Sequence, residues 1–130
     1  MIREGRDMEE KRKKRIIVAD NDHKTCNVLD NVLGKKEEYD IDFVHDGLTL
    51  IKYLKENQDI DAIILDLVMP ERWGTSIFNT VRSVSPVSKL VIYTGFPDYE
   101  KSVFARKADA FVSKTDGTEK LVNVLQNLLG

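Results

Sequence analysis

The chain has 130 residues, of which 42% are hydrophobic and 32% charged, and its formal net charge is −2. This length fits one domain with a substantial core, and the composition is that of an ordinary globular protein. The single cysteine, Cys26, excludes an internal disulfide framework, and no apolar run approaches the roughly 20 residues of a membrane helix. The charged N-terminus has no apolar segment and is no signal peptide, so a cytoplasmic protein is expected.

The charge is unevenly distributed along the chain. Residues 1–15 contain seven Lys or Arg against four Asp or Glu, a local charge of +3 that leaves −5 on the remaining residues. Residues 1–14 show no periodicity and are interpreted as a charged N-terminal extension. The basic run at residues 11–15 is compatible with a nucleic-acid patch or a targeting signal. The acidic body favours a solvated lead-in to the first strand, so binding to nucleic acid by this chain alone is not expected.

From residue 15 onward, short apolar runs alternate with apolar residues at helical spacing. In chain order the predicted elements are strand 16–19, helix 25–33, strand 41–44, helix 48–54, strand 62–65, a helix around 77–81, strand 90–93, helix 98–107, strand 110–112 and helix 121–129. Gly34 closes the first helix, Asp46-Gly47 opens the second, and Ser85-Pro86 ends the third. The second strand is the least apolar and is expected nearer an edge.

This alternation predicts an α/β fold with a doubly wound, five-stranded parallel sheet and helices on both faces. Such a (βα)5 arrangement is flavodoxin-like. No internal linker or repeat interrupts the pattern, so a single domain is expected over residues 15–130.

Polar residues follow the strongly apolar strands. Asp20-Asn21-Asp22 follows the first, Asp66 the third, Thr94 the fourth, and Ser113-Lys114 the last. In open parallel sheets, ligands bind outside the carboxyl ends of the strands, near the switch in strand order. An aspartate in that position is also a common helix N-cap, a role open to Asp20 and Asp22 singly. Together, however, these residues indicate a functional site.

The residue types at these positions suggest a particular chemistry. Converging carboxylates ionise together only at a high cost in free energy unless a cation is near, and an oxygen-rich cluster suits Mg²⁺ or Mn²⁺ rather than zinc. His23 and His45 are too few and too poorly spaced for a zinc site, and surface or cap roles are expected for them. With a cation present, Asp66 could attack phosphorus as a nucleophile, while Lys114 neutralises charge and the Thr94 hydroxyl donates to a phosphoryl oxygen.

Four segments carry a family resemblance. They are the first apolar strand with residues 20–22, residues 65–70 (LDLVMP), residues 91–95 (VIYTG) and residues 108–114 (ADAFVSK). Together they resemble the receiver domain of bacterial-type two-component response regulators, the CheY-like fold. The resemblance covers residues 15–130.

The resemblance implies specific roles at the matching positions. Asp66 would be the phosphoacceptor, Thr94 the switch hydroxyl, Lys114 the phosphate-binding lysine and Phe111 the switch aromatic. The implied Mg²⁺ ligands are Asp20, Asn21, Asp66 and the backbone carbonyl of Val68. The implied donor is a phosphohistidine on a histidine kinase or phosphotransfer protein. The protein would be a switch rather than a turnover enzyme. Its fourth helix, last strand and last helix would change on phosphorylation and could form a homodimer. Without the resemblance, an aromatic at position 111 would be read as ordinary packing.

Two departures from the family pattern leave an alternative open. Asn21 stands where a second acid is usual, which predicts weaker Mg²⁺ binding, and Asp22 could compensate. Residues 71–74 (ERWG) keep only the last glycine of the usual segment. The alternative is a phosphate-independent pseudo-receiver that acts as a protein-interaction module.

Two further readings fit less well. A haloacid-dehalogenase-type phosphohydrolase shares the D-x-D pattern but requires Thr or Val where this chain has Lys24. A flavodoxin-like cofactor binder requires a phosphate-binding loop after the first strand, and the chain has no G-x-G-x-x-G or Walker motif.

Overall fold

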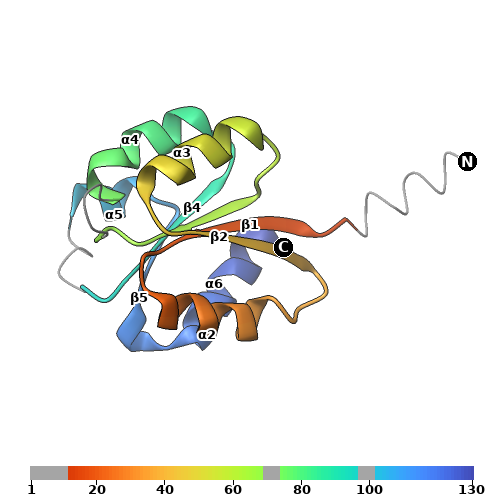
Figure 1. Ribbon diagram of the computed structural model, residues 1–130. Helices are drawn as coiled ribbons and strands as arrows, with labels where there is room; N and C mark the ends of the chain where they lie inside the picture. The colour runs from red at the N-terminus through yellow and green to blue at the C-terminus, as the bar shows by residue number, and fades with distance from the viewer. Residues whose placement is uncertain (1–11, 69–73, 97–101) are drawn as a thin grey trace, which may run out of the picture.

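The computed structural model describes residues 12–68, 74–96 and 102–130 of the chain. In chain order the elements are β1 (Lys14–Ala19), α2 (His23–Leu33), β2 (Tyr39–Val44), α3 (Gly47–Glu56), β3 (Ala62–Leu65), α4 (Gly74–Val84), β4 (Lys89–Thr94), α5 (Val103–Lys107), β5 (Ala110–Ser113), the 3₁₀ turn η2 (Lys114–Asp116) and α6 (Thr118–Leu129). The strands form one parallel sheet of order β2-β1-β3-β4-β5, with helices on both faces (Figure 1). The predicted fold class is therefore confirmed.

The predicted elements are found with small shifts at their ends. β2 lies at an edge of the sheet, as its weaker apolar pattern predicted. β1 begins at Lys14, one residue before the predicted domain boundary, because the Lys14 amide donates to the carbonyl of Glu38. Of the predicted helix 98–107, residues 98–101 lie outside the described residues, and α5 begins at Val103, after its N-cap Ser102.

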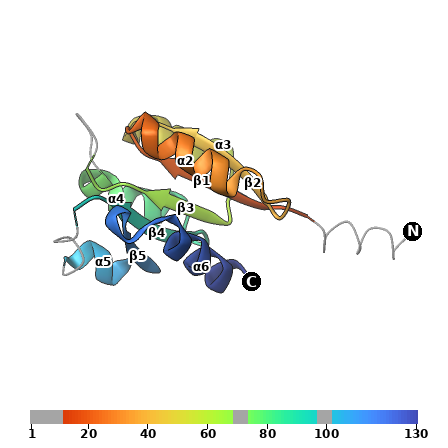
Figure 2. The same ribbon diagram turned by 90° about the horizontal axis from the view of Figure 1, so that it is seen from below.

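Two apolar cores lie on opposite faces of the sheet. One face packs against α3, α4 and α5, and Phe78 on α4 is its largest fully buried side chain. The other face packs against α2 and α6 through residues such as Leu29 and Leu121. Figure 2 shows α2 and α6 on the side of the sheet turned toward the viewer. Strand side chains alternate between the two cores, as Ile16 and Ile17 do on β1.

Helix ends follow the expected capping chemistry. Asp46 caps α3 by accepting the Thr49 amide at 2.8 Å. Gly34 caps the C-terminus of α2, but its backbone stays right-handed, with φ of −66°. The glycine is required there for space rather than for a left-handed turn, because a Cβ atom would lie 2.5 Å from the carbonyl oxygen of Asp30.

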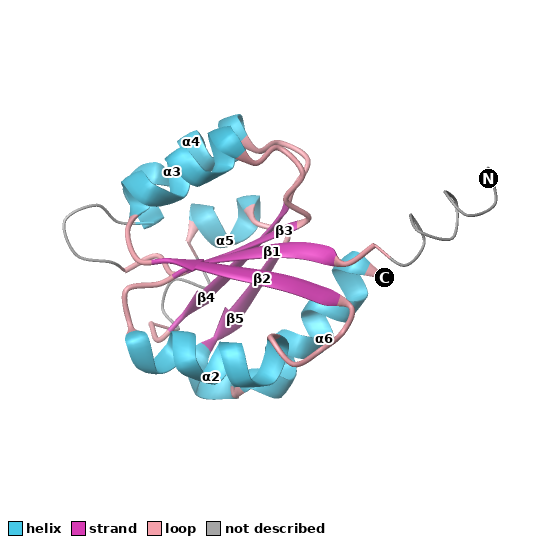
Figure 3. Cartoon of the chain, turned by 45° about the vertical axis from the view of Figure 1, so that its right-hand side comes forward, coloured by secondary structure: helices cyan, strands magenta, loops and turns pink. Residues whose placement is uncertain are grey.

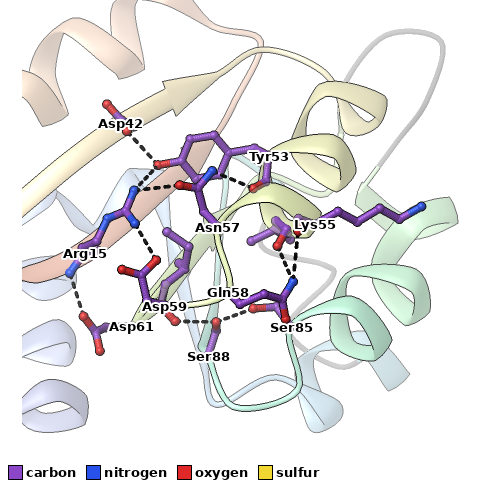
Figure 4. A network of polar contacts seen from close by, with 12 residues as sticks. Arg15, Asp42, Tyr53, Lys55, Asn57, Gln58, Asp59, Asp61, Ser85 and Ser88 are labelled. Carbon is purple, nitrogen blue, oxygen red and sulfur yellow. Dashed lines mark hydrogen bonds and ion pairs between the residues drawn. The ribbon is translucent and has the colours of Figure 1, made fainter.

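A polar network ties together the amino ends of the strands. Figure 4 shows the Arg15 guanidinium of β1 reaching Asp59 and Asn57 in the loop before β3, and the Tyr53 hydroxyl of α3. The Tyr53 hydroxyl donates to Asp42 at 2.7 Å. Burial, followed by this contact with Asp42, raises the pKa of Tyr53 to about 12, so the hydroxyl keeps its proton at neutral pH.

Further side-chain bonds fix the amino ends of the strands near β4. The Ser88 hydroxyl donates to the carbonyl of Ile60 at 2.6 Å, and Ser85 contacts Ser88 in turn. The Asp109 carboxylate accepts the Leu90 amide at 2.7 Å and the Arg82 guanidinium at 3.2 Å. Side chains from α3, α4 and the loops before β3, β4 and β5 thus fix the starts of β1, β3 and β4.

We expect Arg15→Met to lower the free energy of unfolding by about 2 kcal/mol, because it removes charge-assisted hydrogen bonds that join β1 to α3 and to the loop before β3. The measurement is urea denaturation followed by circular dichroism. Lys13→Met, at an exposed position two residues away, is the control and should change stability by less than about 0.5 kcal/mol. Equal effects of the two substitutions would contradict a role for the network.

Within the described part of the chain, none of the helices has the length and apolar character needed to cross a membrane.

Candidate functional site

The strand order creates a switch point between β1 and β3. The chain leaves β1 for the edge strand β2 and then crosses back to β3 on the other side of β1; Figure 3 shows β1 lying between β2 and β3. Ala19 pairs with Leu65, and the Asp66 amide donates to the Ala19 carbonyl at 3.0 Å. The residues that follow these two strands, Asp20 and Asp66, therefore lie side by side at the switch point.

Lys114 joins the two aspartates. Its Nζ lies 2.8 Å from Oδ2 of Asp20 and 3.2 Å from Oδ2 of Asp66. Asp20 is 2% exposed and Asp66 7% exposed, so both carboxylates are almost completely withdrawn from water. Lys114 reaches them from the first position of η2, directly after the last strand. Three residues predicted from separate strand ends thus form one buried ionic cluster.

Burial and the contact between Asp20 and Lys114 shift the pKa of each of these two groups in opposite directions. Burial raises the pKa of Asp20 above the ordinary 3.8, and the hydrogen bond from Lys114 opposes that shift without cancelling it. Burial also disfavours the charged form of Lys114. The hydrogen bond to Asp20 and the charges of Asp20 and Asp66 outweigh this effect, and the pKa of Lys114 rises above 10.5. Lys114 is therefore a cation at neutral pH.

The remaining predicted metal and acid positions surround this cluster. Asn21 is exposed at the turn after Asp20. Asp22 is the N-cap of α2 and accepts the Lys24 amide at 3.0 Å and the Thr25 hydroxyl at 2.9 Å, so its carboxylate is committed to the helix. Its own amide donates to Oδ1 of Asp20 at 2.8 Å. The Val68 amide donates to Oδ1 of Asp66 at 3.1 Å, which orients that carboxylate.

Within the described residues, the two predicted switch residues are not hydrogen-bonded to the cluster. Thr94 is fully buried at the end of β4, and its Oγ1 accepts the Phe96 amide at 3.3 Å. Phe111 is half-buried on β5 and packs against the core beneath α3, α4 and α5. Among the described residues, no hydrogen bond or ion pair connects Thr94 or Phe111 to Asp66 or Lys114.

Sequence reasoning missed two residues that contact the backbone of Asp20. The Nδ1 atom of His45, directly after β2, lies 3.0 Å from the Asp20 carbonyl oxygen. The thiol of Cys26 on α2 lies 3.6 Å from the same oxygen. Burial raises the pKa of Cys26 to about 11, so the thiol is protonated and donates. The pairing of Ala19 with Val44 brings His45 beside Asp20, a register that the sequence does not reveal.

The residues present suit a magnesium ion. Two carboxylates and a neighbouring amide offer oxygen ligands, and Mg²⁺ usually takes one or two carboxylates and keeps several waters. Within the described residues, no group of three or more acidic, histidine or cysteine side chains able to hold a metal occurs. Asp20, Asp66, Asn21 and the Val68 carbonyl are the candidates to hold Mg²⁺.

The raised pKa of Asp20 predicts a pH dependence for cation binding. A cation requires the carboxylate form, and protonation of Asp20 competes with it. We therefore expect Mg²⁺ affinity to fall on acidification, starting at a higher pH than an ordinary carboxyl of pKa 3.8 would require. The measurement is a series of Mg²⁺ titrations at decreasing pH, in which binding is monitored through amide chemical shifts. Affinity that stays constant down to the ordinary aspartate range would contradict it.

The chain matches the family model described as the response regulator receiver domain over residues 16–126. It is 28% identical over 102 residues to the uncharacterized transcriptional regulatory protein YclJ of Bacillus subtilis. That match covers 77% of this chain and 44% of YclJ, so the chain spans less than half the length of this relative.

Solved structures show the same similarity. The response regulator protein TrrA from Thermotoga maritima, crystallised with Mg²⁺ and BeF, is 26% identical, with a TM-score of 0.80 and coverage of 88% of this chain and 98% of that chain. A second structure contains TrrA in complex with the histidine kinase ThkA. The match there has 26% identity and a TM-score of 0.79, and it covers 90% of this chain and 99% of that chain.

Proposed function

Because this chain belongs to the response regulator receiver family, we propose that it is a phosphoacceptor switch of a two-component system that takes a phosphoryl group onto Asp66. The observation that carries the proposal is the cluster of Asp20, Asp66 and Lys114 at the switch point of the sheet. Receiver domains are generally signalling modules rather than turnover enzymes, and we propose that role here.

The geometry supports a simple transfer reaction. An oxygen of Asp66 attacks the phosphorus of a phosphohistidine, a new O–P bond forms, and the P–N bond breaks with its electron pair left on the imidazole nitrogen. Lys114, already 3.2 Å from Asp66, neutralises charge on the phosphoryl oxygens. The Asp66 carboxylate is held for this attack by the Val68 amide.

Mg²⁺, when bound, would supply further positive charge at the phosphoryl oxygens, as the co-crystallised ion of the relative TrrA suggests. Asp20 would hold the ion, because its carboxylate is buried and faces Asp66 across Lys114. Asn21 offers an uncharged oxygen. Weaker Mg²⁺ binding than with a second acid at this position stays a prediction.

The proposed phosphoryl donor is a histidine kinase or phosphotransfer protein, by analogy with TrrA in complex with ThkA. A groove of about 230 Å³ lies beside Lys114. It is lined by Lys24, Thr25, Val28, Tyr93, Lys114, Gly117 and Thr118. Gly117 has φ of +87°, so the chain turns sharply from η2 into α6 at the rim of this groove.

The proposed output is a change at the surface of α5, β5 and α6, which would also be the homodimer surface. Phosphoryl oxygens would attract the Thr94 hydroxyl, now engaged by the Phe96 amide, and Phe111 would follow from its half-buried position. These roles, the domain limits of 15–130 and a cytoplasmic location stay predictions.

The test of the proposed function is intact-mass analysis after incubation with acetyl phosphate and Mg²⁺. We expect the wild-type chain to gain one phosphoryl group, and Asp66→Asn to gain none. Asp40→Asn, which removes an exposed carboxylate on β2, is the control and should be labelled like the wild type. No mass gain in the wild type would overturn the proposal and favour the phosphate-independent interaction module.

A further inference from the structure

The turn that carries Asp20 is held from outside the turn itself. The Asp20 amide donates to the Val44 carbonyl at 3.0 Å, which attaches the turn to β2. Its carbonyl oxygen faces His45 Nδ1 at 3.0 Å. A carbonyl oxygen only accepts, so Nδ1 of His45 carries the hydrogen of this bond. Both backbone groups of Asp20 are therefore fixed by neighbouring residues of one segment.

The His45 ring also reaches the far end of the same turn. Its centroid lies 4.9 Å from that of His23, the first residue of α2, and the two planes are inclined by 51°. His45 therefore contacts the residue that begins the turn and the residue that follows it. Between these contacts, the Asp20 carboxylate accepts the Asp22 amide through Oδ1 and faces Lys114 through Oδ2.

We propose that His45 is a positioning residue, which fixes the Asp20 turn so that its carboxylate is oriented for a divalent cation. The inference rests on the proposed function, because the cation would be the Mg²⁺ of the receiver site. His45 touches neither the cation nor a phosphoryl group in this role; it acts through the backbone of Asp20. Groups that orient a ligand residue in this way commonly set metal affinity.

The position of His45 makes the role testable without disturbing the core. His45 is exposed, whereas Cys26, the other donor to the Asp20 carbonyl, is buried. Substitution of His45 is therefore not expected to leave a cavity. His45→Phe keeps a ring beside His23 but removes the donor. His45→Asn removes the ring and places an amide N–H donor at nearly the same distance from the backbone.

The experiment titrates the ¹⁵N-labelled full chain with Mg²⁺ alone and follows the amide signals of Asn21 and Asp22. We expect His45→Phe to shift these signals before any metal is added and to weaken Mg²⁺ binding by about three- to tenfold, the range of one net hydrogen bond. His45→Asn should bind Mg²⁺ within about twofold of the wild type, since the donor is restored. His23→Phe, which leaves the bond to Asp20 intact, is the matched control.

Two results would overturn the inference. One is wild-type Mg²⁺ affinity in His45→Phe, and the other is an equal loss in His45→Asn and His45→Phe, which would indicate a role for the ring alone. If the wild type itself does not bind Mg²⁺, the proposed function fails. The metal-free spectra then still decide whether His45 holds the turn: a shift of the Asn21 and Asp22 signals in His45→Phe but not in His45→Asn supports it, and unchanged signals refute it.

Discussion

Lys114→Met is expected to lower the free energy of unfolding by about 3 kcal/mol at neutral pH in the absence of divalent cations. The substitution leaves two nearly buried carboxylates, Asp20 and Asp66, without the cation that both now contact. Urea denaturation with and without Mg²⁺ is the measurement. Mg²⁺ should stabilise the variant more than the wild type, because a bound cation replaces the lost charge and favours the folded state.

Lys120→Met provides the matched control. Lys120 also forms an ion pair, with Asp116 at 3.2 Å, but both side chains are about half exposed. Such surface pairs contribute less than about 1 kcal/mol, and no Mg²⁺ dependence is expected. Similar losses in the two variants, or a Lys114→Met protein that Mg²⁺ fails to restore, would show that the buried cluster is not electrostatically coupled in the way the distances indicate.

Phe78→Ala is expected to cost about 3–5 kcal/mol of unfolding free energy, the range for large-to-small changes in a packed core. Phe78 is 1% exposed on α4, and its ring lies 5.4 Å from that of Phe104 in an edge-on arrangement. The loss should appear in urea denaturation. Hydrogen exchange should also quicken over α5, because Phe104 on that short helix loses a packing partner.

Val103→Ala is the control for the faster hydrogen exchange over α5. Val103 lies on α5 beside Phe104 but is 45% exposed, so its truncation should change stability by only about 0.5 kcal/mol. If Phe78→Ala left exchange over α5 unchanged, α5 would be held by contacts other than the aromatic pair.

The fold was predictable because its elements are marked locally. The continuous apolar runs 16–19, 62–65 and 90–93 all became central strands, and the mixed run 41–44 became one of the two edge strands. Such patterns reflect burial on one or both faces, which depends on each strand's own side chains. Helix starts were marked in the same way, as Asp46 shows.

The candidate site was predictable only in part. Asp20, Asp66 and Lys114 could be placed at one edge of the sheet because parallel strands present their carboxyl ends together. The role of Asp22 as an N-cap could not be separated from a role in the cluster by sequence, since the same residue type serves both. His45 was missed for another reason. Its contact with Asp20 depends on the register between β1 and β2, a long-range property that no local pattern encodes.

The network at the amino ends of the strands has a consequence for motion. Arg15, Ser88 and Asp109 fix that edge through side-chain bonds between elements far apart in sequence. At the carboxyl ends of the strands, within the described residues, the Lys114 side chain links the loops after β1, β3 and β5. Local unfolding that costs less free energy than global unfolding is therefore expected mainly at the carboxyl ends of the strands. We therefore expect the amino ends of the described strands to stay in register when the contacts of Lys114 with Asp20 and Asp66 open.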